Sequence, residues 1–283
     1  MKLSGLFGAT DLHERIRAGT VLVVDCRFDL ADATRSARDY SEGHIPGAVY
    51  ADLNADLSDL SKTDLGRHPV PNAVAFAAVL ARWGWTPDTP VVAYDAANGA
   101  LAAARLWWML RLCGAREVAV LDGGLAAWTQ TGFALDAQSV RRQPTRVEVA
   151  FDAAQIVYTQ ALVGALRQPQ TLLLDARAAP RFRGENETID KVAGHVPGAR
   201  NRPFTDNLDA DGRFKPAAQL RTEFTALLGS HLPQDTIHMC GSGVTACHNL
   251  LAMEYAGLSG SRLYAPSWSG WISDPGRPVA TNA

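Results

Sequence analysis

The residue best suited to chemistry is Cys240, which ends the apolar run TIHMC and begins the phrase CGSGVTA. Two glycines and several small side chains let such a loop curl so that backbone N–H groups point inward, and we expect a helix to begin around residues 244–246. These donors and the helix dipole stabilise a thiolate at the base of the loop. The sequence therefore predicts a nucleophilic cysteine in a loop formed by Gly241, Ser242, Gly243, Val244 and Thr245, whose amides and hydroxyls would also hold a persulfide anion.

The other three cysteines have a different setting. Cys26, Cys113 and Cys247 lie within apolar strand or helix patterns, and we interpret them as core residues. Cys247 precedes His248, but this pair lacks the spacing and the second ligand pair of a zinc site. The spacing of the four cysteines does not resemble a disulfide framework, so we expect free thiols in a reducing compartment.

The elements that position Cys240 belong to a sequence that repeats itself. The segment VLVVDCR at residues 21–27 matches TLLLDAR at residues 171–177, and both are typical of buried parallel strands. Downstream of each strand, GHIPGA begins at Gly43 and GHVPGA begins at Gly194, and both phrases predict a tight turn. The chain is therefore interpreted as an internal duplication.

A second pair of matches completes the repeat. The strand VVAYD ends at Asp95 where TIHMC ends at Cys240, and each is followed by a glycine-containing loop and an Ala/Leu-rich helical stretch. Trp128 in LDGGLAAW corresponds to Trp271 in LYAPSWSGW. Since ligand sites in parallel α/β sheets lie outside the carboxyl ends of the strands, the exchange of Asp95 for Cys240 marks the functional difference between the halves.

Strands that alternate with helical stretches predict an α/β fold with parallel sheets covered by helices on both faces. We expect two tandem domains, at residues 1–135 and 149–283, joined by a polar linker at residues 136–148. One large doubly wound sheet is the alternative, and the repeated order of motifs favours duplication.

The composition restricts the partners of the protein. The formal net charge is −2 at pH 7 and the charged residues are interspersed, which gives no basic surface for nucleic acid or anionic lipid. The N-terminal residues lack the apolar stretch of a secretory signal, and no later segment is apolar for long enough to span a bilayer. We therefore expect a soluble, cytoplasmic protein.

The phrases CGSGVTACHN, GH[IV]PGA and LDGGLAAW together resemble the two-domain rhodanese sulfurtransferases, and the resemblance covers essentially the whole chain. The loop CGSGVT is similar to the 3-mercaptopyruvate form, whereas thiosulfate-specific members usually carry larger basic residues directly after the cysteine. The resemblance implies transfer of sulfur from 3-mercaptopyruvate to a thiol or cyanide through a Cys240 persulfide, without a metal or an organic cofactor. Thiosulfate is the alternative donor, and a thioredoxin-like protein is a possible acceptor. The resemblance also implies that the first domain is catalytically silent, in agreement with Asp95.

The resemblance assigns the substrate carboxylate to an arginine in an RF pair, which is Arg181 here. A second arginine of the animal mercaptopyruvate enzymes is missing, and Thr188 stands at about its place. Arg183 or Lys191 would compensate because both lie on the same loop, although each could equally be a solvated surface charge.

The resemblance further pairs Ser242 with the GHxPGA histidine of the first domain, His44, in a proton relay between the halves. Its acidic partner is left open among Asp29, Asp32 and Asp39. The alternative is that His44 only holds its own turn by hydrogen bonding, because His195 occupies the equivalent turn.

Two other classes of protein are alternatives to a sulfurtransferase. A cysteine phosphatase requires an arginine at the end of the loop to bind phosphate bidentately, and Thr245 and Ala246 occupy those positions. A non-enzymatic thiol sensor would form a disulfide between Cys240 and Cys247. A persulfide transfer assay distinguishes the enzyme from the sensor.

Overall fold

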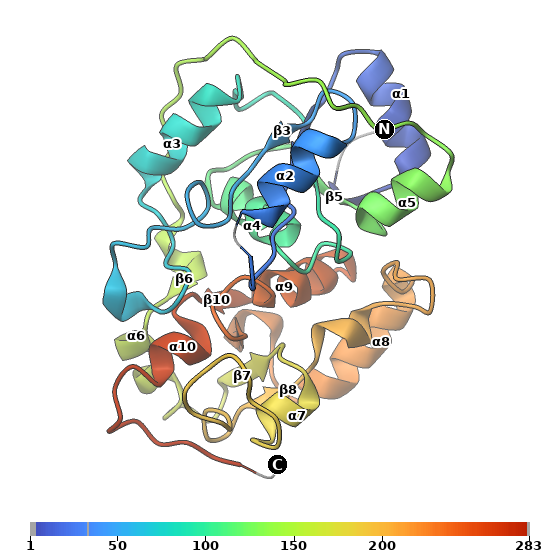
Figure 1. Ribbon diagram of the computed structural model, residues 1–283. Coiled ribbons are helices and arrows are strands. Elements are labelled where there is room, and N and C mark those ends of the chain that lie inside the picture. The colour runs from blue at the N-terminus through green and yellow to red at the C-terminus, as the bar shows by residue number, and fades with distance from the viewer. Residues whose placement is uncertain (1–3, 33, 282–283) are drawn as a thin grey trace. The chain divides into compact units, whose positions relative to one another are not determined.

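The computed structural model describes residues 4–32 and 34–281 of the chain (Figure 1). The chain divides into two compact units, and neither is a continuous stretch of sequence. The first unit contains the residues up to Asp59, then Val70–Asp152 and Asp211–Arg213. The second unit contains Leu60–Pro69, Ala153–Ala210 and the residues from Phe214 onward. Ten residues from the middle of the first half thus belong with the second unit.

Each unit contains one parallel sheet of five strands, and the two sheets have the same strand order. The first sheet runs β1 (Ser4–Phe7), β5 (Val118–Leu121), β4 (Val91–Tyr94), β2 (Leu22–Asp25), β3 (Val49–Tyr50). The second runs β6 (Ile156–Val157), β10 (Arg262–Tyr264), β9 (Thr236–Met239), β7 (Leu172–Asp175), β8 (Arg200–Asn201). The predicted duplication of an α/β domain is confirmed.

Helices connect the strands of both sheets (Figure 1). Those of the first unit are α1 (Ala9–Arg17), α2 (Arg35–Glu42), α3 (Ala73–Arg82), α4 (Ala103–Leu112) and α5 (Gly124–Gln130). Those of the second unit are α6 (Thr159–Ala165), α7 (Ala179–Phe182), α8 (Ala217–Leu228), α9 (Ala246–Tyr255) and α10 (Ser267–Trp271). Every residue of β2, β4, β7 and β9 is buried. Because successive side chains of a strand point to opposite faces, both faces of each sheet are covered. Among the described residues, no helix is long and apolar enough to cross a membrane.

The repeated Asp-x-Arg and Gly-His phrases are joined by the same hydrogen bonds in each unit. In the first unit, Arg27 Nη2 donates to Asp25 Oδ2 at 2.6 Å and to the Gly43 carbonyl at 2.7 Å. In the second unit, Arg177 Nη2 donates to Asp175 Oδ2 at 2.7 Å and to the Gly194 carbonyl at 2.8 Å. The arginine therefore links the end of a central strand to the turn before the histidine. Removal of one member of such a buried pair costs about 3–5 kcal/mol, which accounts for the repetition of both phrases.

The two equivalent tryptophans, Trp128 and Trp271, each belong to the hydrophobic core of one unit. Trp128 packs among the apolar residues of the first sheet and donates from Nε1 to the Ala134 carbonyl at 3.0 Å. Trp271 packs among those of the second sheet and donates from Nε1 to the Pro278 carbonyl at 2.9 Å. Each indole is thus buried with its single donor satisfied.

Residues 136–148 contain no helix and no strand, and they pack onto the first unit. Asp136 and His44 exchange two backbone hydrogen bonds, both of 2.8 Å. Thr145 Oγ1 donates to the Trp85 carbonyl at 2.6 Å. A few residues after this segment, the chain passes from the first unit to the second between Asp152 and Ala153.

Candidate active site

Cys240 directly follows β9, which lies between β10 and β7 in the second sheet. Its backbone N–H donates to Ser267 Oγ at 3.1 Å, and its carbonyl accepts from the Trp268 N–H at 2.9 Å. The residue is only 2% exposed. The cysteine is therefore held rigidly at the carboxyl end of an inner strand, where parallel α/β sheets place their ligands.

The loop after Cys240 needs glycine at position 243. Gly243 has φ +77°, and a Cβ atom on it would collide with the Ala265 carbonyl oxygen. The loop is also bonded to α10, because the Gly241 carbonyl accepts from the Ser269 N–H at 2.9 Å. Helix α9 begins at Ala246, directly after the loop. The cysteine, the turn and the helix start thus follow one another as the sequence predicts.

The corresponding loop of the first unit surrounds a buried carboxylate. Asp95 follows β4 and is fully buried. Its carboxylate accepts hydrogen bonds of 2.8–3.1 Å from five backbone N–H groups, those of Ala97, Gly99, Leu101, Ala102 and Ala103. Burial raises the pKa of Asp95, and the backbone donors oppose that rise. In the first repeat, a loop at the end of the fourth strand therefore surrounds an acidic group with amides.

Ser242 has a histidine partner, but not the one that the sequence suggested. Ser242 Oγ lies 2.8 Å from Nδ1 of His68, and both residues are buried. His68 belongs to residues 60–69, the segment that packs with the second unit. This hydrogen bond corrects the expected pairing of Ser242 with His44.

His44 holds its own turn instead. Its Nδ1 lies 2.8 Å from the Tyr40 carbonyl, and its ring stacks on Tyr40 with 4.0 Å between centroids. His195 repeats this arrangement in the second unit, with Nδ1 2.8 Å from the Phe182 carbonyl and its ring stacked on Phe182 at 3.8 Å. The equivalence of the two histidines supports a role in the turn, which was the alternative interpretation of His44.

Two arginines share one carboxylate near the loop. Arg181, in the short helix α7, donates from Nη2 to Asp190 Oδ2 at 3.0 Å. Arg67 donates from Nη1 to Asp190 Oδ1 at 2.7 Å. Arg181 Nε also donates to both carboxylate oxygens of Glu187, at 3.1 and 3.0 Å. We call Arg67, Arg181, Glu187 and Asp190 the arginine cluster.

The arginine cluster adjoins the residue after Cys240. A Cβ atom on Gly241 would lie 3.1 Å from Nη2 of Arg67, 3.7 Å from Nη2 of Arg181 and 3.7 Å from Oδ2 of Asp190. The absence of a side chain at Gly241 therefore lets charged groups from two other segments approach the loop. Sequence reasoning anticipated Arg181 and missed Arg67, which precedes His68 in a segment with no recognisable motif.

The other cationic candidates have different surroundings. Arg183 donates from Nε and Nη2 to Glu185 at 2.7 and 2.8 Å, and its side chain is 37% exposed. Lys191 is exposed. Neither side chain has the shared, buried carboxylate that fixes Arg67 and Arg181.

The arginine cluster contains two cations and two anions. Burial raises the pKa of Glu187, but hydrogen bonds from Arg181 and from the backbone of Asp190 outweigh it and lower the pKa overall. Glu187 also lies 3.5 Å from Nη1 of Arg177. The member of the cluster nearest to Gly241 is the guanidinium of Arg67, while Arg181 and Asp190 are equally distant from it.

The other three cysteines and His238 lie in or near the protein core. Burial raises the pKa of Cys26 well above its usual value and that of Cys113 to about 12. Cys247 Sγ donates to the Gly243 carbonyl at 3.5 Å. Burial lowers the pKa of His238 to about 3, so this imidazole is neutral at physiological pH. Among the described residues, no group of three or more His, Cys, Asp or Glu side chains is arranged to hold a metal ion.

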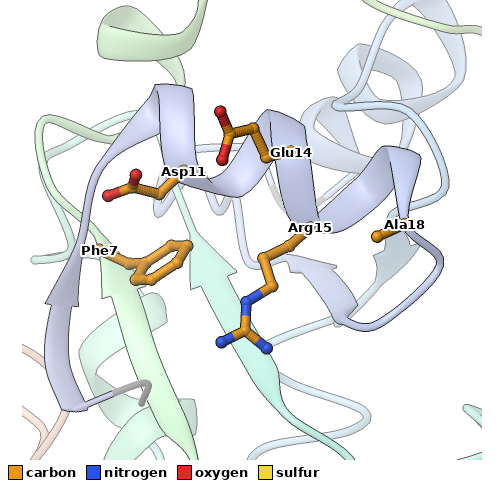
Figure 2. A pocket seen from close by; sticks show the side chains of 5 residues that line it. All are labelled: Phe7, Asp11, Glu14, Arg15 and Ala18. Atoms are coloured by element: carbon orange, nitrogen blue, oxygen red, sulfur yellow. The ribbon is translucent and has the colours of Figure 1, made fainter. Parts of the chain in front are cut away.

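A cavity of about 240 Å³ lies on the first unit, beside β1 and α1 (Figure 2). It is lined by Phe7, Asp11, Glu14, Arg15 and Ala18. This lining offers carboxylates and a guanidinium from one helix but no thiol or histidine, so it does not provide a nucleophile.

The chain is similar to known sulfurtransferases along nearly its whole length. The rhodanese-like domain family matches the chain twice, at residues 8–131 and 159–274. The "Probable 3-mercaptopyruvate sulfurtransferase" of Pseudomonas aeruginosa is 50% identical over 283 residues, covering 99% of each chain. The "Thiosulfate sulfurtransferase" of Cricetulus griseus is 32% identical over 92% of this chain and 89% of its own length. The crystal structure of SseA from Escherichia coli, described as a 3-mercaptopyruvate sulfotransferase, superposes with a TM-score of 0.82 at 33% identity, covering 94% of this chain and 99% of SseA.

The chain belongs to the rhodanese-like family and contains two copies of its domain.

Proposed function

We propose that this chain takes sulfur from 3-mercaptopyruvate and passes it to a thiol or to cyanide through a persulfide on Cys240. The chain is a sulfurtransferase, and relatives that bear this name match nearly its whole length. The observation that carries the choice of donor is the position of Arg67 and Arg181 beside the residue that follows Cys240. A donor that has a carboxylate close to its sulfur fits this arrangement.

The first step forms the persulfide. The Cys240 thiolate attacks the sulfur of mercaptopyruvate, so that an S–S bond forms and the C–S bond breaks. The electron pair of the C–S bond leaves as pyruvate enolate, which takes a proton to become pyruvate. Arg181 and Arg67 orient the carboxylate, and the loop amides stabilise negative charge on sulfur.

The pair of Ser242 and His68 supplies a route for that proton. Their 2.8 Å contact permits a proton to pass between Oγ and Nδ1 in either direction. Ser242 lies two residues after Cys240, within the same loop. We therefore assign to this pair the relay that was expected for Ser242 and His44.

The second step regenerates the enzyme. A thiolate acceptor, for example that of a thioredoxin-like protein, or a cyanide ion attacks the outer sulfur of the persulfide, and the Cys240 thiolate is the leaving group. The chemistry requires no metal and no organic cofactor. We further propose that the enzyme works in the cytoplasm, because all four cysteines are free and the catalytic step needs a reduced thiol.

Thiosulfate is the second candidate donor, since some relatives are named for it. It is a dianion, and position 241 carries no basic side chain of its own. The monoanionic keto acid is therefore the better match to a site in which two guanidinium groups are already paired with carboxylates.

Replacement of Cys240 by serine tests the assignment of the nucleophile. The variant should form no persulfide and transfer no sulfur from either donor, because a hydroxyl is far less acidic and less nucleophilic than a thiol. Intact-mass analysis after incubation with mercaptopyruvate should show the gain of one sulfur atom in the parent protein only. The matched control is Cys247→Ser, which should keep the gain, whereas a thiol sensor would require both cysteines. Transfer by Cys240→Ser would refute the mechanism.

A further inference from the structure

Asp190 is the central member of the arginine cluster. Its side chain is only 4% exposed, and each of its carboxylate oxygens accepts a hydrogen bond from a different arginine. A carboxylate in this position holds the two guanidinium groups side by side. It also contributes a fixed negative charge beside Gly241, whose added Cβ would lie 3.7 Å from Asp190 Oδ2.

Arg67 is fixed from its backbone as well as from its side chain. Its N–H donates to Ser269 Oγ at 3.0 Å. The preceding Gly66 has φ +88°, and a Cβ atom there would collide with the Pro266 carbonyl oxygen. The segment therefore packs tightly against α10 and the proline that precedes it. Arg67 Nε is buried and has no hydrogen-bond partner among the described residues, so the guanidinium keeps an unused donor.

The charges of the arginine cluster should change the affinity for a sulfur donor by an amount that depends on the charge of that donor. Arg67 and Arg181 attract any anion, while Asp190 and Glu187 repel it. Repulsion from one fixed carboxylate is felt about twice as strongly by a dianion as by a monoanion, because Coulomb energy is proportional to charge. The carboxylates thus reduce the affinity of the site for thiosulfate more than its affinity for a monocarboxylate.

We propose that Asp190 is a specificity-determining residue, which positions Arg67 and Arg181 for a monocarboxylate donor and by its own charge disfavours dianionic donors at Cys240. This inference rests on the proposed function for its choice of substrates. The underlying claim, that the charge of Asp190 is felt at the Cys240 sulfur, is independent of sulfur transfer and can be tested separately.

Alkylation kinetics measure that charge without any sulfur donor. Iodoacetamide and iodoacetate react with the same thiolate by the same displacement, but only iodoacetate is an anion, so the ratio of their rate constants reports the local potential. Asp190→Asn, which keeps the size and the acceptor oxygen, should raise the iodoacetate-to-iodoacetamide ratio roughly three- to tenfold at low salt. Arg67→Gln should lower the ratio by a similar factor, which provides a second variant if Asp190→Asn folds poorly.

Donor kinetics then test the specificity. Asp190→Asn should raise kcat/KM for thiosulfate relative to that for mercaptopyruvate, by roughly tenfold. The matched control is Glu185→Gln, which removes the same charge from an exposed carboxylate of the same loop and should change neither ratio. Unchanged alkylation ratios in both Asp190→Asn and Arg67→Gln would overturn the inference. A shifted alkylation ratio with an unchanged donor preference would overturn the specificity role, and a lack of transfer from any donor in the parent enzyme would contradict the proposed function alone.

Discussion

Replacing Gly243 by alanine should distort the loop that holds Cys240, and the size of the effect can be estimated from the structure. An L-residue at φ +77° costs about 1–2 kcal/mol relative to glycine. The new Cβ would also collide with the Ala265 carbonyl oxygen, and relief of such overpacking by backbone movement costs about 1–3 kcal/mol more. The expected loss of stability is therefore about 2–5 kcal/mol, together with displacement of the loop amides.

Gly198 provides a matched control for the conformational part of this cost. It has φ +83°, but a Cβ atom there would meet nothing within 4 Å. Gly198→Ala should lose about 1–2 kcal/mol, lower Tm by a few degrees and retain full turnover per folded molecule. Gly243→Ala should lose more stability and nearly all turnover, because the proposed stabilisation of the Cys240 sulfur by the loop amides depends on this backbone conformation.

The assays are thermal unfolding followed by circular dichroism, and persulfide formation from mercaptopyruvate measured on the folded fraction. The free energies of unfolding of Gly243→Ala and Gly198→Ala should differ by about 1–3 kcal/mol, which is the cost of the collision with the Ala265 carbonyl. Equal loss of stability in both variants, with turnover retained by Gly243→Ala, would refute the conclusion that the Ala265 carbonyl makes glycine necessary in the loop.

The other predictions concern the relay, the arginines, acid stability and the buried thiols. His68→Gln should lower kcat roughly ten- to a thousandfold with mercaptopyruvate and less with thiosulfate, since only the first donor releases an enolate that needs a proton; equal losses in stopped-flow assays would argue against the relay. Arg183→Ala should raise KM for mercaptopyruvate less than Arg181→Ala does in steady-state assays. The pKa of Glu223 is lowered to about 2, because hydrogen bonds from Arg202, Lys215 and Gln219 outweigh the rise caused by burial. Its contribution to stability is therefore present above pH 4.5 and lost as the pH falls toward 2, so Glu223→Gln should cost about 1 kcal/mol in urea unfolding at pH 7 and little at pH 2. Cys113→Ser should leave turnover unchanged in the same assay.

The duplication could be predicted from sequence because its signals are short and local. Asp25 and Arg27 are two residues apart, and the Gly43 carbonyl that the arginine binds begins the next recognisable phrase. Cys240 was predicted for the same reason, since the strand, the glycine loop and the helix start are contiguous in the chain. Features made by neighbouring residues leave a pattern that can be found without the structure.

The residues that contact Ser242 and Asp190 could not be found in this way. His68 and Ser242 are 174 positions apart, and Arg67 and Asp190 are 123 apart. No periodicity or turn motif marks residues 60–69 as belonging with the second unit. The GHxPGA histidine is recognisable in the sequence because it is repeated, and in both units its ring contacts a backbone carbonyl of the preceding helix.

The ten residues at 60–69 have a consequence for the history of the molecule. After a gene duplication, the copy without the reactive cysteine would ordinarily be free to decay or to be deleted. Here that copy encodes His68 and Arg67, which bond to Ser242 and Asp190 of the other copy. Under the proposed mechanism, selection for sulfur transfer acts on both halves of the gene. A shortened chain that begins at Ala153 would retain Cys240 but lack the side chains that bond to Ser242 and Asp190.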